Sequence, residues 1–408
     1  MRHWPIALSP NASIRDSLLA LKLLLSPWQW RDGAALAKVT DWFKTELGAT
    51  HVYLLNSGRA ALFVLLKALD LRPGDEVIMQ AFTCLAVPTP VIWAGGRPVY
   101  VDIDPATLNM SLEGLKAAIN TRTKAIIVQH TFGNPAPLNE ILALAQSQGI
   151  VVIEDCAHAL GARLPDGTWA GTQGQAAFFS FGRDKVASSV FGGALVVNDP
   201  QLVPRVSAVM AKISKPRHSW VTQQLMHPIL TVPLASMVLP GTGPVLKLLE
   251  FLKILSKAIV TKEYGGQKPD YWPALYPNAL ARLLLPQLVG LNEIQAHRTQ
   301  IAEVYRQILP QAALIKTDRS TVPWLRFPVK AKQNSPVLRA ARRGVLPIGD
   351  WYTCPVAPMR TNLTAVEYTP GLCPNVEKAA LTIVNLPTHR HVTESAARTL
   401  AQWLLPYV

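Results

Sequence analysis

Short apolar runs alternate with stretches of helical periodicity along the first half of the chain. The runs 77–79, 125–128 and 149–155 predict buried strands, and 112–120 and 138–148 predict helices. Strands that are apolar throughout are typical of a parallel sheet covered on both faces, so we expect helices on each side. This rhythm of strand and helix predicts a mostly parallel sheet joined by right-handed crossovers.

Two predicted strands end in side chains that carry chemistry. The run 149–155 ends at Asp155, and the aromatic-rich run 176–180 is followed by Lys185. Ligands gather at the carboxyl ends of parallel strands. Burial favours the neutral amine of a lysine, the form that attacks an aldehyde, although a solvated loop lysine is the alternative. An aspartate and a lysine about thirty residues apart suit pyridoxal phosphate (PLP), because the acid keeps the pyridine nitrogen protonated and the amine holds the aldehyde.

Two further motifs complete a family pattern. The segments 56–62 (Asn-Ser-Gly-Arg-Ala-Ala-Leu) and 101–105 (Val-Asp-Ile-Asp-Pro) precede the two strand ends. In this order and spacing, the four motifs resemble those of the DegT-type sugar-nucleotide aminotransferases, a branch of the fold-type-I PLP enzymes. The resemblance runs from residue 54 to 199 and resumes more weakly from 277 to the C-terminus.

The resemblance implies an α/β fold: an aspartate-aminotransferase-like, fold-type-I PLP-transferase large domain with a mostly parallel sheet, plus a smaller α+β C-terminal domain. A length of 408 residues is itself too great for one ordinary core. We therefore expect an N-terminal helical arm over 1–30, the large PLP-binding domain over 31–204, an apolar helical insertion over 205–270 and the small domain over 271–408.

The resemblance also implies roles for individual residues. Lys185 would bind the cofactor aldehyde covalently and move the proton during catalysis, while Asp155 would pair with the pyridine nitrogen. Ser57, Gly58 and Ser180 would hold the phosphate, because a helix N-terminus offers free amides to an anion. No metal ion takes part in this scheme.

Other positions fit the pattern less simply. His158 stands where relatives have histidine or glutamine, and it is either a hydrogen-bond donor to the cofactor or a packed histidine. Arg59 replaces the usual threonine, so it either adds charge to the phosphate contact or points away. Cys84 stands where an aromatic ring usually stacks on the pyridine. Either Phe82, two residues earlier, or the Cys84 sulfur is the candidate for that contact.

The C-terminal part carries fewer signals. Pro273 and Leu275 stand where the family has an asparagine and a basic residue that reach the neighbouring subunit's cofactor, so that contact is unsupported here. The spacing of apolar residues predicts one long amphipathic helix over 283–309 that starts the small domain. Trp351 and Tyr352 are candidates for the wall of a substrate pocket, with simple packing at its edge as the alternative.

The lysine also bears on the reaction, because the family's sugar dehydratases have histidine at the position of Lys185. We therefore expect a PLP-dependent aminotransferase that moves an amino group from an amino acid, glutamate in many relatives, to a nucleotide-linked keto-sugar in cell-surface polysaccharide or amino-sugar biosynthesis. The resemblance implies a homodimer. Two alternatives stay open: another PLP-dependent enzyme acting on a lipid-linked or small substrate at the membrane, and a non-catalytic regulatory relative.

Composition narrows the partners and the compartment. The formal charge of +14 suits phosphorylated ligands, an anionic membrane face or nucleic acid, but no nucleic-acid-binding motif accompanies it. The four cysteines are scattered without a close pair, which argues against a zinc site or a disulfide scaffold and favours a reducing compartment. Because residues 1–5 show no features of a secretory signal, we expect a cytoplasmic protein.

Two apolar segments raise the question of membrane contact. Residues 13–30 are too short and interrupted to span a bilayer, so we expect a helix that covers the main domain or a partner, with Trp28 and Trp30 at lipid headgroups as the alternative. The segment 225–259 predicts two short apolar helices joined by a Pro/Gly turn. Its basic flanks, within 205–262, suit a peripheral membrane contact; a dimer contact or a lid is the other interpretation.

Overall fold

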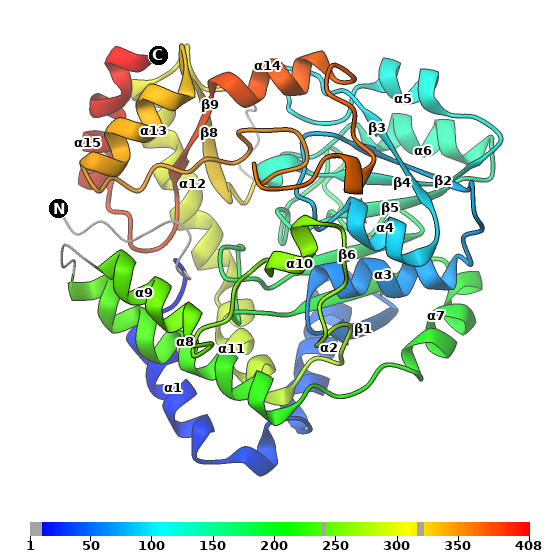
Figure 1. Cartoon of the computed structure of the whole chain (residues 1–408), viewed down its shortest axis with the longest axis horizontal. Helices are drawn as coiled ribbons and strands as arrows, with labels where there is room; N and C mark the ends of the chain where they lie inside the picture. Colours follow the sequence, from blue (N-terminus) through cyan, green and yellow to red (C-terminus); the bar gives the residue numbers. More distant parts are fainter. Residues whose placement is uncertain (1–9, 238–241, 316–321) are drawn as a thin grey trace.

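A seven-stranded sheet forms the centre of the computed structural model, which describes residues 10–237, 242–315 and 322–408. Its strands are β1 (His51–Leu55), β2 (Glu76–Gln80), β3 (Arg97–Val101), β4 (Thr123–Gln129), β5 (Val151–Asp155), β6 (Ala176–Ser180) and β7 (Gly193–Val197). They lie in the order β1-β7-β6-β5-β4-β2-β3, and of these seven only β7 runs against the rest. The predicted mostly parallel sheet is confirmed (Figure 1).

Helices cover both faces of this sheet. Alternate residues of one strand belong to two separate hydrophobic clusters, so that Val152 lies in one and Ile153 in the other. One face carries α3 (Gly58–Ala68), α4 (Pro88–Ala94) and α7 (Val203–Met210); the other carries α2 (Ala34–Leu47), α5 (Leu112–Ala118), α6 (Leu138–Gln146) and α11 (Asn278–Val289). Because each strand is covered on both faces, its sequence is apolar throughout.

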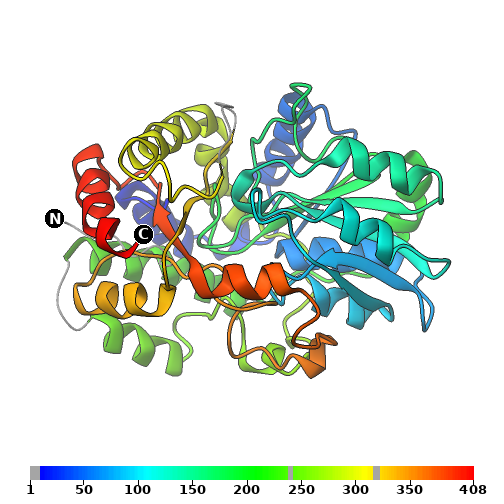
Figure 2. The same ribbon diagram turned by 90° about the horizontal axis from the view of Figure 1, so that it is seen from above.

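The C-terminal domain is built on two antiparallel strands, β8 (Arg326–Lys330) and β9 (Ile383–Pro387). Its helices are α12 (Leu291–Ile308), α13 (Asn334–Arg343), α14 (Pro374–Thr382) and α15 (Glu394–Leu404). Short 3-10 turns lie at Pro27–Gln29, Thr131–Gly133, Pro200–Leu202, Thr364–Val366 and Leu405–Tyr407. Figure 2 shows this domain beside the large one.

The prediction of one helix over 283–309 is wrong. The chain forms two helices there, α11 and α12, which meet at Gly290. Glycine is a poor helix former, and Pro286 lacks the amide hydrogen that would continue the hydrogen bonding of α11. The break lets α11 pack on α2 in the large domain, while α12 packs on α15.

The arm and the insertion lie together at one end of the molecule (Figures 1 and 2). The arm forms α1 (Ile14–Leu24), which packs against α8 (His218–Met237) of the insertion. The insertion continues with α9 (Thr242–Phe251) and α10 (Thr261–Tyr264). The predicted helix pair is confirmed, although α8 is longer than expected and continues through two prolines. Among the described residues, no helix has the length and apolarity needed to cross a bilayer.

The return from β6 to β7 determines where Lys185 lies. Because β7 runs antiparallel to β6, the loop 181–192 between them stays at the carboxyl end of β6. Asp155 ends the adjacent strand β5 at the same edge, and the turn after β1 begins α3 there. The reactive residues predicted from separate motifs therefore meet at one edge of the sheet.

Candidate active site

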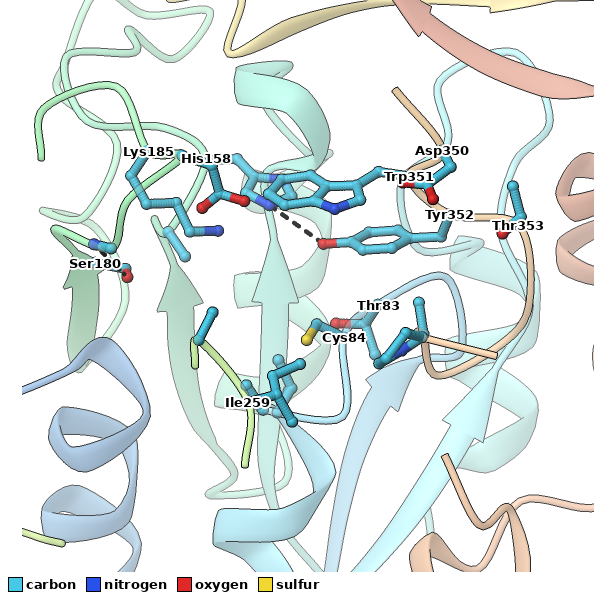
Figure 3. Close-up of a pocket in the computed structure, with 18 of the residues that line it drawn as sticks. Thr83, Cys84, His158, Ser180, Lys185, Ile259, Asp350, Trp351, Tyr352 and Thr353 are labelled. Atoms are coloured by element: carbon cyan, nitrogen blue, oxygen red, sulfur yellow. Dashed lines mark hydrogen bonds between the residues drawn. The ribbon is translucent and has the colours of Figure 1, made fainter. Parts of the chain in front are cut away.

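A cavity of about 910 Å³ lies at this edge. Its wall includes all the predicted site residues except Phe82, namely Ser57, Gly58, Arg59, Cys84, Asp155, His158, Ser180 and Lys185. Figure 3 shows Lys185 and Ser180 on one side, Trp351 and Tyr352 on another, and Cys84 and Ile259 across from them. The cavity is therefore shared by the large domain, the C-terminal domain and the insertion.

Asp155 is the buried acid of the cavity. Its Oδ1 accepts the Ala157 N–H at 3.0 Å, which leaves Oδ2 without a hydrogen-bond partner among the described residues. Burial raises the pKa of Asp155 to about 6, and the Ala157 hydrogen bond and the nearby Lys185 and His130 oppose this rise. A carboxyl of this kind holds or shares a proton near neutral pH, and a protonated ring nitrogen would favour its ionised form.

The neighbouring Glu154 has a structural task. Its carboxylate accepts the N–H groups of Gly171, Gln173 and Gly174 at 2.6, 2.8 and 2.7 Å and lies 3.1 Å from His130 Nε2. Glu154, His130 and Cys156 have the chemistry of metal ligands and lie close together. Because the carboxylate oxygens are already committed to the backbone, we assign this cluster to holding the 171–174 loop beside β5.

Lys185 is held by its backbone, while its side chain reaches into the cavity (Figure 3). Its N–H donates to Gly182 O at 3.1 Å, and the Asn11 amide donates to its carbonyl. Lys185 Nζ lies 4.8 Å from the ring centroid of Trp351 and makes no hydrogen bond within the described part of the chain. The guanidinium of Arg326 packs on the same ring, 3.5 Å from the centroid. The amine is thus positioned by its loop and free at its tip.

His158 is a neutral hydrogen-bonding side chain. Burial holds its pKa well below the usual range, and the positive charges of Lys185 and Arg326 act in the same direction. Its Nδ1 accepts the Phe132 N–H at 3.3 Å, so the ring proton lies on Nε2, which donates to the Tyr352 hydroxyl at 3.2 Å. Its ring also stacks on Trp351, with centroids 5.2 Å apart.

The start of α3 forms an anion-binding end of the cavity. Ser57 caps the helix, and its Oγ accepts both the Ala60 N–H and the Trp272 Nε1–H at 3.1 Å. The Ser57 hydroxyl therefore keeps its own hydrogen to donate. A Cβ on Gly58 would lie 2.9 Å from Ser180 Cβ, so glycine is needed for the close approach of the two phosphate-binding motifs. Free amides and two hydroxyls at one helix N-terminus suit a phosphate group.

Arg59 lies in the cavity wall and is bound to the insertion. It forms a buried ion pair with Glu263 of α10, whose side chain is fully buried. Burial lowers the pKa of Arg59. Of the two interpretations of Arg59, therefore, neither a free phosphate ligand nor an outward-pointing side chain describes it. Arg59 joins the start of α3 to a segment about two hundred residues away.

A second buried arginine makes a similar contact. Arg183, two residues before Lys185, donates to the carbonyl and hydroxyl of Ser256, and Ser256 Oγ donates to Gln224 Oε1 at 2.7 Å. The residues between these anchors, Ala258 and Ile259, line the cavity. The part of the insertion after α9 is therefore a wall of the site that belongs to the same chain.

The aromatic groups are arranged differently from the family pattern. Phe82 is fully buried, packs edge-on against Tyr352 at 5.3 Å and is not part of the cavity wall. Cys84 lines the cavity, and burial raises the pKa of its thiol. Trp351 and Tyr352, two pocket candidates in the sequence, both line it. They are the aromatic rings nearest Lys185 in this arrangement (Figure 3).

The segment around Pro273 turns back onto its own chain. Ala274 N–H donates to Asn56 Oδ1 at 3.3 Å, and Asn56 N–H donates to Ala274 O at 2.9 Å. With the Trp272 contact to Ser57, these hydrogen bonds hold the segment beside the phosphate-binding turn. The sequence did not reveal this contact, because neither Pro273 nor Leu275 has a polar side chain.

Three arginines line the exposed part of the cavity and were not predicted. Arg339 and Arg342 come from α13, and Arg360 from the following loop. All three are solvent-exposed, and no carboxylate among residues 10–237, 242–315 and 322–408 forms an ion pair with them. This basic group, which we call the α13 arginines, is suited to an anionic part of a substrate.

Taken with the sheet order, a lysine after β6 and a buried aspartate at the end of β5 define the class: the chain has the fold of the fold-type-I PLP-dependent enzymes. The chain belongs to the DegT/DnrJ/EryC1/StrS aminotransferase family, whose model matches residues 14–227 and 276–404. The resemblance predicted from four motifs is confirmed. The match omits residues 228–275, which include most of the insertion.

Individual relatives cover less of the chain. A UDP-N-acetyl-3-dehydro-alpha-D-glucosamine 3-aminotransferase of Acidithiobacillus ferrooxidans is 43% identical over 156 residues, 38% of this chain and 42% of that protein. The GDP-perosamine synthase of Escherichia coli O157:H7 is 32% identical over 205 residues, 50% and 56% of the two chains. The chain thus matches about half the length of these relatives.

Among solved structures, a DegT DnrJ EryC1 StrS aminotransferase from Brucella abortus superposes with a TM-score of 0.74. The alignment covers 96% of this chain and 95% of that one, at 21% identity. At this identity the likeness shows the fold, and the predicted fold class is confirmed.

Proposed function

We propose that this chain is a PLP-dependent aminotransferase that moves an amino group from an amino acid to a nucleotide-linked keto-sugar. The observation that carries the proposal is the pairing, in one cavity, of the unbonded Lys185 amine with the buried carboxyl of Asp155. Family membership supports the transamination, and the two relatives described above are named for nucleotide-linked amino sugars.

The residues present fit PLP. Asp155 Oδ2 lacks a partner among the described residues and would face the pyridine nitrogen, and the turn at Ser57 and Gly58 with Ser180 would hold the phosphate. When bound, PLP supplies an aldehyde for the amino group and an electron sink for the bond that is broken. His158, with its proton on Nε2, lies on the same wall and would donate to the cofactor.

The protein's own groups supply binding and proton transfer. Lys185 Nζ would attack the aldehyde and, once displaced by the substrate amine, would carry a proton between the two carbons that exchange it. Asp155 keeps the ring nitrogen charged, because an ionised carboxylate in a buried site stabilises a cation beside it. The wall formed by Ala258 and Ile259 excludes water from this side of the reacting atoms.

The α13 arginines favour a substrate with a diphosphate. A cavity of about 910 Å³ has room for more than a cofactor, and these three arginines lie where its wall meets solvent. Guanidinium groups bind phosphate oxygens through paired, charge-assisted hydrogen bonds. A nucleotide-linked sugar therefore suits the site better than a small neutral ketone. A role in polysaccharide or amino-sugar biosynthesis follows from that substrate class.

Three parts of the proposal rest on the resemblance alone. They are glutamate as the amino donor, a homodimer as the assembly and a cytoplasmic location. The first is checked by supplying different amino acids in the assay, and the second by the mass of the protein in solution.

The test is turnover with a panel of nucleotide-linked keto-sugars and ¹⁵N-glutamate, read by mass spectrometry of the amino-sugar product. We expect incorporation of ¹⁵N by the wild type and none by Lys185→Ala. Equal turnover in the two proteins would overturn the assignment of Lys185. Turnover of a lipid-linked sugar but of no nucleotide-linked one would favour the alternative substrate class.

A further inference from the structure

Helix α1 exposes an apolar stripe. Four side chains spaced three or four residues apart lie on one side of it, with exposed fractions of 59, 60, 49 and 75% for Ile14, Leu18, Leu21 and Leu25. Another side of the helix, with Ala20 and Leu23, is fully buried. Trp28 follows in the next turn and is 74% exposed. The helix thus has one apolar side packed on the protein and a second one that the chain leaves uncovered.

Helix α9 exposes a second stripe. Val245, Leu248 and Leu252 recur along one side, and Phe251 beside them is 81% exposed. Figures 1 and 2 place α1, α8 and α9 at the same end of the molecule. Exposed apolar side chains scattered singly need no explanation, but two helical stripes at one end mark an interaction surface. We call these stripes, with Trp28, the apolar end.

Basic residues surround the apolar end. The segment 205–262 contains eight lysines and arginines and a single acidic residue, Glu250. Lys253 and Lys257, just after α9, are exposed, and so are Arg15 and Lys22 beside the stripe of α1. An apolar helical face with basic neighbours has the chemistry of a helix that lies in the interface of an anionic bilayer.

We propose that the apolar end seats this protein on an anionic lipid surface. The stripes of α1 and α9 enter the boundary between headgroups and acyl chains, and the lysines beside them bind anionic headgroups. A second copy of the chain fits less well, because pairing two such surfaces brings like charges together and the centres of protein interfaces are poor in lysine. This binding is independent of the proposed reaction, since the apolar end contains no catalytic residue.

The test is co-sedimentation of the full-length, PLP-loaded protein with vesicles. We expect binding to vesicles of equal parts phosphatidylglycerol and phosphatidylcholine, and little binding to phosphatidylcholine alone. Leu18→Ser with Phe251→Ser should weaken binding about tenfold per side chain, because each buries less apolar area. Lys253→Gln with Lys257→Gln should weaken it about fivefold per charge at low salt.

Leu372→Ser is the matched control, since Leu372 is 52% exposed in the C-terminal domain, away from this surface, and its loss should leave binding unchanged. All variants replace exposed side chains, and circular dichroism checks that each is folded. Failure of the wild type to bind, or equal binding by Leu18→Ser with Phe251→Ser, would overturn the proposal. Dissociation of a dimer by that double variant, with no change in vesicle binding, would assign the surface to a second copy instead.

Discussion

Replacing Glu263 by glutamine should open the wall of the cavity that the insertion provides. The side chains of Glu263 and Arg59 are 0 and 5% exposed, so the substitution leaves a buried guanidinium without its counter-charge. Removing one partner of a buried ion pair costs about 3–5 kcal/mol. The pair connects α10 to the start of α3, so this energy is lost from the closed state of the insertion. Amide exchange over residues 254–267 should accelerate at least about a hundredfold.

Hydrogen-exchange mass spectrometry measures this opening directly. Lys262→Gln is the matched control, because Lys262 is the neighbouring residue and its ion pair with Asp270 is exposed. A surface pair contributes about 0–1 kcal/mol, so exchange in this control should stay within about fivefold of the wild type. Equal exchange in Glu263→Gln and Lys262→Gln would refute the idea that the buried pair holds the insertion over the cavity.

Three further predictions concern the cofactor and substrate. Arg342→Gln should raise the KM for a nucleotide-linked keto-sugar about tenfold by removing a charge-assisted contact, whereas Arg343→Gln, its neighbour outside the cavity wall, should not; steady-state kinetics of both decide this. The pKa of Asp155, about 6 when folded, means that this carboxyl destabilises the cofactor-free fold as pH rises above about 4. Asp155→Asn should therefore stabilise that form by about 3 kcal/mol at pH 8, not at pH 4, in urea unfolding, while weakening PLP binding; equal gains at both pH values would contradict this. Gly58→Ala should lower PLP affinity about tenfold in equilibrium dialysis, since its Cβ would crowd Ser180, and unchanged affinity would show that the close approach is not needed.

The strand ends of the site could be predicted because local sequence determines them. Strands such as β5 are buried on both faces, so their apolar runs mark both their bounds and the residue that ends each one. The parallel arrangement then brings Asp155, Ser180 and the Lys185 loop to one edge. The turn at Ser57 follows from the same logic, because a cap residue and a glycine mark the start of a helix.

Contacts between distant segments could not be predicted. Nothing near Arg59 or Glu263 in the sequence indicates that they pair, since two hundred residues separate them and each is compatible with an exposed position. The α13 arginines join the site because the C-terminal domain is placed against the sheet edge, which no periodicity encodes. The ring of Phe82 faces inward for a similar reason, because Tyr352 of that domain packs on it.

The central claim is that Lys185 is the residue that binds PLP. The most direct measurement is an absorption spectrum of the purified protein with PLP before and after borohydride reduction, followed by peptide mapping. We expect a band in the visible or near-ultraviolet range that borohydride abolishes, and a pyridoxyl group on Lys185. A label on another lysine, or no band at saturating PLP, would contradict the account and favour a non-catalytic relative.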